Sequence, residues 1–85
     1  MDNLNIYKKA FIESFEIKES ILDKLEYNEI DEWDSIGHMN LISALEENFK
    51  ITFETDDIVD FSSFKKGKKI LSKYKIKFRD YDKSN

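Results

Sequence analysis

The chain has 85 residues and a net charge of −4, with no cysteine and no proline. A chain of this length fits one domain with a single small core, which leaves no room for a catalytic cleft of ordinary depth. The lack of cysteine excludes disulfides and cysteine-ligated metal sites and is compatible with a reducing compartment, so a cytoplasmic location is expected.

Charge is divided unevenly along the chain. Residues 1–64 contain 16 acidic and 5 basic side chains, whereas residues 65–85 contain 2 acidic and 9 basic ones. An acidic body repels nucleic acid and is steered toward enzymes with basic docking patches, so we expect no nucleic-acid partner. No apolar run approaches the ~20 residues that span a bilayer, and no signal-peptide pattern occurs, so we expect no stable membrane insertion.

Apolar side chains near the N-terminus recur at steps of three and four: Leu4, Tyr7, Phe11 and Phe15. This spacing predicts a first helix from about Asn3 to Phe15. Residues 16–34 would make an unusually long unstructured connection. A short helical turn that contains Ile21, Leu22 and Leu25 is therefore expected within this long first loop.

A second helix is predicted from Ser35 to about Phe49. Its expected core stripe contains Met39, Ile42, Leu45 and Phe49, with Leu41 at the margin. At about 100° per residue, Ile36 falls away from that stripe and is expected to be exposed.

Two further helices are expected after a short connection. Thr55 is predicted to cap a short helix over residues 56–61, whose early aspartates suit the positive end of a helix. Ser62 or Ser63 is predicted to cap the last helix, whose expected inner face contains Phe64, Gly67, Leu71 and Tyr74. At Gly67 the missing side chain suggests a close contact.

The absence of proline and the presence of only two glycines favour helices over turns. The predicted fold is therefore all-α, a small four-helix bundle with three longer helices, a short third helix and a long first loop. Residues 1–75 are expected to form the domain, and residues 76–85 a polar, basic C-terminal tail.

The main functional signal is Asp34-Ser35-Ile36 at the start of the second helix, followed by Leu45-Glu46-Glu47-Asn48-Phe49 at its end. An isolated Asp-Ser pair is most often only a helix cap. A helix start also stabilises a phosphate, through its unpaired amides and its dipole. Together with the acidic segment over residues 54–61, the arrangement resembles the acyl carrier protein family, over nearly the whole chain up to about Tyr74.

The resemblance implies a carrier of covalently tethered substrates and not an enzyme. Ser35 would be esterified with 4′-phosphopantetheine by a separate phosphopantetheinyl transferase, and Asp34 would contribute to recognition by that transferase. The arm would hold an acyl group as a thioester on its own thiol, which a chain without cysteine cannot supply. An acyl-loading ligase or transferase and downstream biosynthetic enzymes would be the other partners of a monomeric carrier.

The resemblance also implies a docking surface on the second and third helices. The candidate partner-binding residues are Ile36, Met39, Glu46, Glu47, Asp56 and Asp57. Without the motif, the acidic members would be read as solvated positions. Adjacent carboxylates on a helix point about 100° apart, and no further ligand pattern accompanies them, so no metal site is expected.

Three other features have simpler readings. Trp33 is expected to anchor the loop before Ser35 in the core. His38 is expected to be an exposed helix residue and not a general base, because no acid or oxyanion site accompanies it. The basic C-terminal region, with Lys65, Lys66, Lys68, Lys69, Lys73, Lys75, Lys77 and Arg79, is expected to be a solvated outer face.

The predicted function is that of an acyl carrier protein. The tryptophan before the motif, together with Gly37 and Asn40 where many carriers are acidic, favours a specialised lipid, polyketide or surface-polysaccharide pathway over bulk fatty acid synthesis. Three alternatives stay open: an aminoacyl or peptidyl carrier protein that uses the same serine, an unmodified helical adaptor, and a basic-tailed membrane-surface protein.

Overall fold

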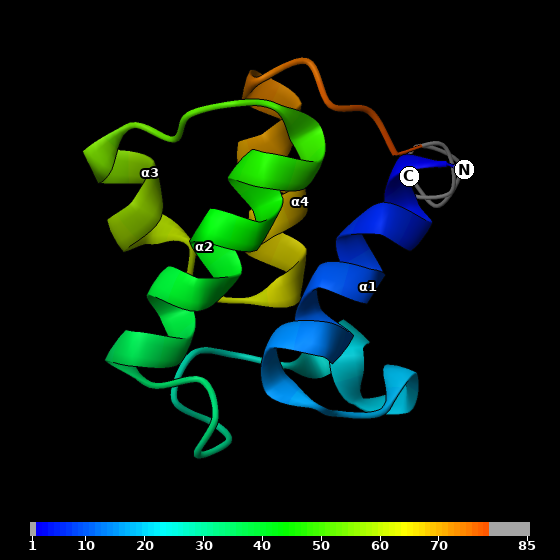
Figure 1. Ribbon diagram of the computed structural model, residues 1–85, viewed down its shortest axis with the longest axis vertical. Coiled ribbons are helices and arrows are strands. Elements are labelled where there is room, and N and C mark those ends of the chain that lie inside the picture. Colours follow the sequence, from blue (N-terminus) through cyan, green and yellow to red (C-terminus); the bar gives the residue numbers. More distant parts are fainter. Residues whose placement is uncertain (1, 79–85) are drawn as a thin grey trace.

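The structure, a computed structural model, describes residues 2–78 and is mainly helical (Figure 1). The elements are α1 (Asn3–Phe15), the 3-10 helix η1 (Glu19–Lys24), α2 (Ser35–Phe49), α3 (Thr55–Asp60) and α4 (Phe64–Lys73). Within residues 2–78 there is no strand, and one isolated bridge joins Glu26 to Ser63. The all-α prediction is confirmed. No helix of the described part is both long enough and apolar enough to cross a lipid bilayer.

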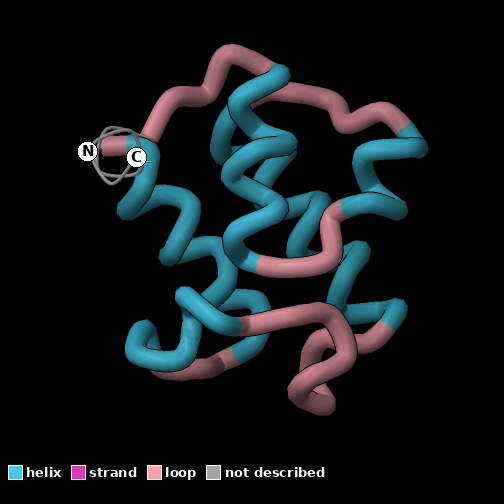
Figure 2. The backbone as a smooth tube through the Cα atoms, turned by 180° about the vertical axis from the view of Figure 1, so that it is seen from behind, coloured by secondary structure: helices cyan, strands magenta, loops and turns pink. Residues whose placement is uncertain are grey.

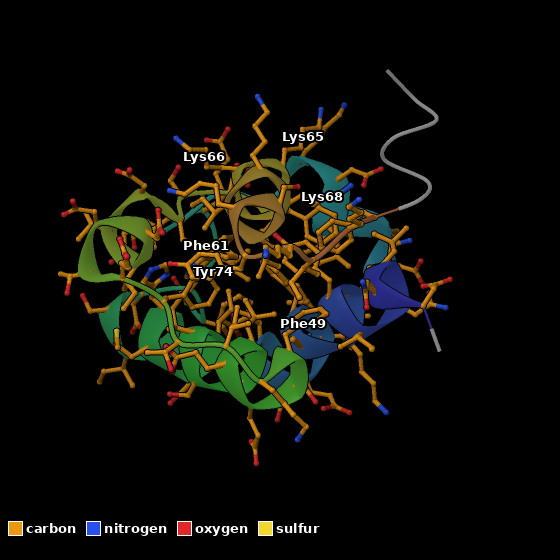
Figure 3. The ribbon with its side chains drawn as sticks, turned by 90° about the horizontal axis from the view of Figure 1, so that it is seen from above. Phe49, Phe61, Lys65, Lys66, Lys68 and Tyr74 are labelled. Carbon is orange, nitrogen blue, oxygen red and sulfur yellow. The ribbon has the colours of Figure 1, made fainter. Side chains whose placement is uncertain are left out.

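The helices surround one interior. In Figure 1, α2 lies between α1 and α3, with α4 behind it, and Figure 2 shows the same arrangement from behind. Seen from above, side chains from α1, α2, α3 and α4 meet in the middle (Figure 3). The labelled Phe49, Phe61 and Tyr74 lie on the inner side of the backbone, whereas Lys65 and Lys66 point away from it.

The core is built largely from aromatic rings. The Tyr7 ring lies at the centre of this core, with its centroid 4.8 Å from that of the Phe64 ring and 5.3 Å from that of the Phe78 ring. The Tyr7 hydroxyl donates a hydrogen bond of 2.6 Å to the carbonyl oxygen of Phe64. Burial raises the pKa of the Tyr7 hydroxyl well above its usual value. A Cβ on Gly67 would lie 2.2 Å from this hydroxyl and 2.3 Å from Phe61 Cζ, so glycine permits the predicted close contact.

Side-chain caps set the starts of three helices. Asp2, Asp34 and Ser63 accept hydrogen bonds from the first-turn amides of α1, α2 and α4 respectively. The predicted bounds of α1 and α2 are confirmed, as is the helical turn in the first loop. The predicted cap of α3 is wrong: Glu54 precedes the helix without a side-chain cap, and Thr55 is its first residue.

The core face of α2 differs from the predicted stripe. Leu41 is fully buried, whereas Met39 is 49% exposed. Burial on α2 centres near Leu45, and six residues back along a helix place Met39 about 120° away from it. Ile70 of α4 is also buried, which the predicted inner face omitted.

The described chain continues into the core beyond the predicted domain boundary. Phe78 is buried, and the carbonyl of Lys77 accepts a hydrogen bond of 3.0 Å from the Asn3 side chain. Residues 76–78 are therefore part of the domain and not of a tail. The rest of the predicted tail, residues 79–85 with Arg79 and Tyr81, lies outside the described residues.

Candidate functional site

Ser35 is the first residue of α2 and is exposed to solvent. The cap is provided by its neighbour Asp34, whose Oδ1 accepts a 2.8 Å hydrogen bond from the amide of Gly37 and whose carbonyl accepts one from His38. The serine hydroxyl is therefore not used as the cap. Its one hydrogen-bond contact among the described residues is with the Tyr27 hydroxyl, 3.4 Å away.

The turn before Ser35 crosses closely over the start of α2. Gly37 is buried, and a Cβ there would lie 1.9 Å from the backbone carbonyl oxygen of Glu32 and 3.3 Å from the Phe15 ring. Only a residue without a side chain fits beneath the crossing chain. Gly37 thus has a packing reason for its identity.

Trp33 anchors this turn, as predicted. Its side chain is fully buried and stacks on Phe15 with 5.3 Å between ring centroids, and it meets the edge of Phe11 at 5.4 Å. The indole Nε1 donates a 2.9 Å hydrogen bond to Nδ1 of His38.

His38 does not lie as predicted, because it is half-buried and bonded on both sides. Its Nδ1 receives the Trp33 hydrogen bond, and its Nε2 lies 2.8 Å from the carbonyl oxygen of Ile58 in α3. The imidazole thereby connects the turn before Ser35 to a different helix. The sequence spacing alone gives no sign of either contact.

An apolar groove opens beside Ser35, between α2 and α3. Its volume is about 360 Å³, and it is lined by Tyr27, Ser35, His38, Met39, Ile58, Val59 and Phe61. Val59, which lines this groove, is 75% exposed, and Ile36, the residue after Ser35, is 74% exposed. The serine hydroxyl therefore lies at the edge of an apolar surface.

The predicted acidic docking residues fall into two groups. Glu47 and Asp56 are exposed, as a docking surface requires. Glu46 is half-buried, and its Oε2 accepts a hydrogen bond from the amide of Phe53. The interpretation of Asp57 as an open acidic position is wrong, because Asp57 is only 4% exposed and its carboxylate is engaged by α4.

Asp57 is bound by two side chains of the last helix and its cap. Lys73 Nζ lies 2.5 Å from Oδ1, and the Tyr74 hydroxyl donates to Oδ2 over 2.6 Å. These hydrogen bonds, that of Lys73 first and that of Tyr74 second, hold the pKa of Asp57 below its usual value. The hydrogen bond to Asp57 raises the pKa of Lys73, whereas burial and then this bond raise the pKa of Tyr74.

The basic residues of α4 lie mostly on its outer face. Lys65, Lys66 and Lys69 are exposed, and Lys68 Nζ lies 4.9 Å from the centre of the Phe64 ring. Within residues 2–78 no group of three or more histidine, aspartate or glutamate side chains is placed to hold a metal ion.

The start of α2 has the features that a phosphate ester on Ser35 would need. Its hydroxyl is open to solvent, and the amides of Ser35 and Ile36 have no hydrogen-bond acceptor among residues 2–78. Such unpaired amides at a helix start interact favourably with a negative charge.

Comparisons of this chain with known protein families, with curated proteins and with solved structures found no match. Sequence reasoning missed Tyr27, Ile58 and Val59 as neighbours of Ser35. Tyr27 lies in an irregular loop, and α3 is too short for its apolar positions to form a periodic signal.

Proposed function

We propose that this chain is an acyl carrier protein, which carries acyl intermediates as thioesters on a 4′-phosphopantetheine arm attached to Ser35. The observation that carries the proposal is the exposed Ser35 hydroxyl at the start of α2, beside an apolar groove and outside the helix cap. The sequence resemblance described above adds the identity of the attached group.

The attachment step needs an acceptor and no catalytic group in this chain. The Ser35 oxygen forms a bond to the phosphorus of coenzyme A that carries the pantetheine arm, and the pyrophosphate bond breaks. Adenosine 3′,5′-bisphosphate leaves, and the serine proton passes to a base of the phosphopantetheinyl transferase. The chain acts as a carrier and not as an enzyme, because loading, transfer and release of the cargo belong to the partner enzymes.

Partner recognition is proposed to use the exposed side chains around Ser35. Ile36 and Met39 supply apolar contact, and Glu47 and Asp56 supply negative charge for basic patches on the transferase, the acyl-loading enzyme and downstream biosynthetic enzymes. Asp34 contributes through the cap that holds the turn. We propose that the carrier acts as a cytoplasmic monomer in a specialised lipid, polyketide or surface-polysaccharide pathway, and an aminoacyl or peptidyl cargo on the same serine is the alternative within this class.

An unmodified helical adaptor is the alternative from another class. Two aliphatic side chains that are three-quarters exposed, Ile36 and Val59, favour it, since a partner protein would cover them without any modification of Ser35. The two proposals differ in one respect that is simple to measure, which is whether Ser35 accepts the arm.

The absence of cysteine makes this test specific. The protein is incubated with coenzyme A, magnesium and a broad-specificity phosphopantetheinyl transferase, its mass is measured, and its thiols are titrated after removal of coenzyme A. We expect the mass of the arm to be added and one thiol per chain to appear in the wild type and in the Ser43→Ala control, whose exposed serine lies on the same helix. Ser35→Ala should gain neither. A wild-type chain that stays unmodified while a known carrier is modified in the same mixture would exclude the carrier function.

A further inference from the structure

His38 lies between the turn before Ser35 and helix α3. Within the described residues, no other side-chain hydrogen bond joins these two segments. On one side the Trp33 indole donates to Nδ1 over 2.9 Å, and on the other Nε2 lies 2.8 Å from the carbonyl of Ile58. Trp33 precedes Ser35 by two residues, and His38 follows it by three. The hydrogen bond between them therefore spans the attachment turn, and the Ile58 contact fixes that turn to α3.

The partners determine the tautomer of the imidazole. An indole N–H only donates, so Nδ1 must carry a lone pair, and a carbonyl oxygen only accepts, so Nε2 must carry the proton. A neutral imidazole protonated at Nε2 satisfies both partners at once. A side chain with only an acceptor at this position would keep the hydrogen bond from Trp33, and one with only a donor would keep the hydrogen bond to Ile58.

The rings around His38 support this placement. The imidazole plane is nearly parallel to the Trp33 ring, 6.2 Å between centroids and 17° between planes, and Tyr27 and Phe61 meet it edge-on at 5.4 Å and 6.1 Å. Tyr27 is also the hydroxyl neighbour of Ser35. The imidazole therefore contacts both Trp33 in the turn before Ser35 and Tyr27, the hydroxyl neighbour of Ser35.

We infer that His38 is a positioning residue for modification of Ser35: it holds the attachment turn and α3 in one fixed relation, through the chain Trp33 Nε1, His38 imidazole and Ile58 carbonyl. This inference rests on the proposed function. His38 does not touch the reacting atoms, and three of the four exposed docking side chains, Ile36, Met39 and Glu47, lie on α2 and not on α3. Its loss should therefore lower kcat of arm transfer, because the hydroxyl is misplaced, and leave KM for the carrier nearly unchanged.

Two substitutions separate the two hydrogen bonds. In His38→Asn the amide oxygen reaches the place of Nδ1 and still accepts from Trp33, but the side chain is too short for Ile58. In His38→Gln the amide nitrogen reaches the place of Nε2 and still donates to Ile58, but no acceptor faces Trp33. Asn40→Gln, on an exposed position of the same helix, is the matched control.

Arm transfer is measured with each variant as substrate of the phosphopantetheinyl transferase. We expect kcat to fall about tenfold for His38→Gln and less for His38→Asn, with KM within about twofold and Asn40→Gln unchanged. We also expect the α3 amides to exchange faster in His38→Asn than in His38→Gln. Equal kcat values in wild type and His38→Gln would overturn the inference.

Trp33 is the only tryptophan, so it can be replaced uniformly by benzothienylalanine, which has the same shape but no N–H. This replacement should slow transfer in the wild type and have no further effect in His38→Gln, because both changes remove the same hydrogen bond. Additive effects would overturn the inference.

A spectroscopic measurement tests the two hydrogen bonds of His38 independently of arm transfer. In ¹⁵N-labelled wild type, the neutral imidazole should show a protonated Nε2 and an unprotonated Nδ1. The opposite tautomer would overturn the inference even where the carrier is loaded normally. If the wild type shows the expected tautomer and slow exchange of the α3 amides but accepts no arm, the proposed function is wrong, whereas the connection of the turn to α3 through His38 is confirmed.

Discussion

The carboxylate of Asp57 accepts a 2.6 Å hydrogen bond from the Tyr74 hydroxyl, and this contact joins the six-residue helix α3 to the end of α4. Lys73 binds the other carboxylate oxygen, and the same Tyr74 hydroxyl accepts a hydrogen bond from the amide of Glu54 just before α3. A helix this short has little stability of its own. These polar contacts, together with the His38 contact to Ile58, therefore hold α3 in place.

Asp57→Ala should lower the free energy of unfolding by about 2 kcal/mol, the usual loss for hydrogen bonds to a charged group with its partners left behind. Asp56→Ala, at the exposed neighbouring position, should change it by less than about 0.5 kcal/mol. Urea unfolding followed by circular dichroism measures both. Equal stabilities of the two variants would show that the α3 to α4 connection contributes nothing.

The contribution of Asp57 should also depend on pH. Its folded pKa lies below the ordinary 3.8, so its contribution is complete above pH 3.8 and is lost as pH falls through the folded pKa. The pKa of Lys73 is raised above its ordinary 10.5, so its contribution is complete below pH 10.5 and is lost as pH rises further. The stability difference between wild type and Asp57→Ala should therefore be largest between these values.

Urea unfolding of both proteins at pH 7 and at pH 3 provides the measurement. The gap between them should be smaller at pH 3 than at pH 7. A gap of the same size at both values would mean that Asp57 is not stabilised as a carboxylate in the folded protein.

The helices could be predicted because their signals are local. Asp34 and Ser63 are good N-cap residues, and the apolar spacing over residues 3–15 repeats with the helix period, so starts and lengths followed from short stretches of sequence. The exposed Ser35 followed from the same local signal. The sequence did not predict that Leu41 is buried and Met39 exposed, because the centre of the buried face depends on how α2 packs against its neighbours.

The contacts of the site are long-range and could not be read from spacing. Asp57 has the same appearance in the sequence as Asp56, and only the fold brings Lys73 and Tyr74 to one of them. His38 likewise gains its role from Trp33 in a loop and from Ile58 in another helix. The contacts of polar side chains such as Asp57 and His38 could therefore be assigned only from the three-dimensional structure.

Gly67→Ala should destabilise the protein although alanine is the better helix former. The added Cβ would meet the Tyr7 hydroxyl and the Phe61 ring at 2.2 and 2.3 Å, and Tyr7 is itself fixed by its hydrogen bond to Phe64. Overpacking of this kind costs about 1–3 kcal/mol, more than the ~1 kcal/mol gained in helix propensity. Lys69→Ala, exposed on the same helix, is the control for unfolding in urea, and a more stable Gly67→Ala variant would contradict the close packing.

Phe78→Ala should cost about 3–5 kcal/mol in the free energy of unfolding, as expected for an aromatic side chain removed from a core. Phe78 is buried against Tyr7, five residues beyond the end of α4. Lys77→Ala removes a neighbouring exposed side chain and should change stability by less than about 0.5 kcal/mol. If Phe78→Ala is as stable as the wild type, residues 76–78 do not belong to the domain, and the domain ends at residue 75 as predicted from the sequence.

Ile36→Ala should reduce partner reactions without reducing stability. Ile36 is 74% exposed next to Ser35, so its truncation removes little buried surface and should change the free energy of unfolding by less than about 0.5 kcal/mol. If it is an apolar anchor of the docking surface, KM for the carrier should rise in the phosphopantetheinyl transferase reaction, roughly tenfold for a contact worth more than ~1 kcal/mol. Ile21→Ala is the matched control, because Ile21 is 41% exposed and lies on η1, outside the proposed docking surface on α2 and α3. Equal KM values for the two variants and the wild type would mean that the transferase recognises Ser35 without using Ile36, which would leave Met39, Glu47 and Asp56 as the remaining candidates for docking.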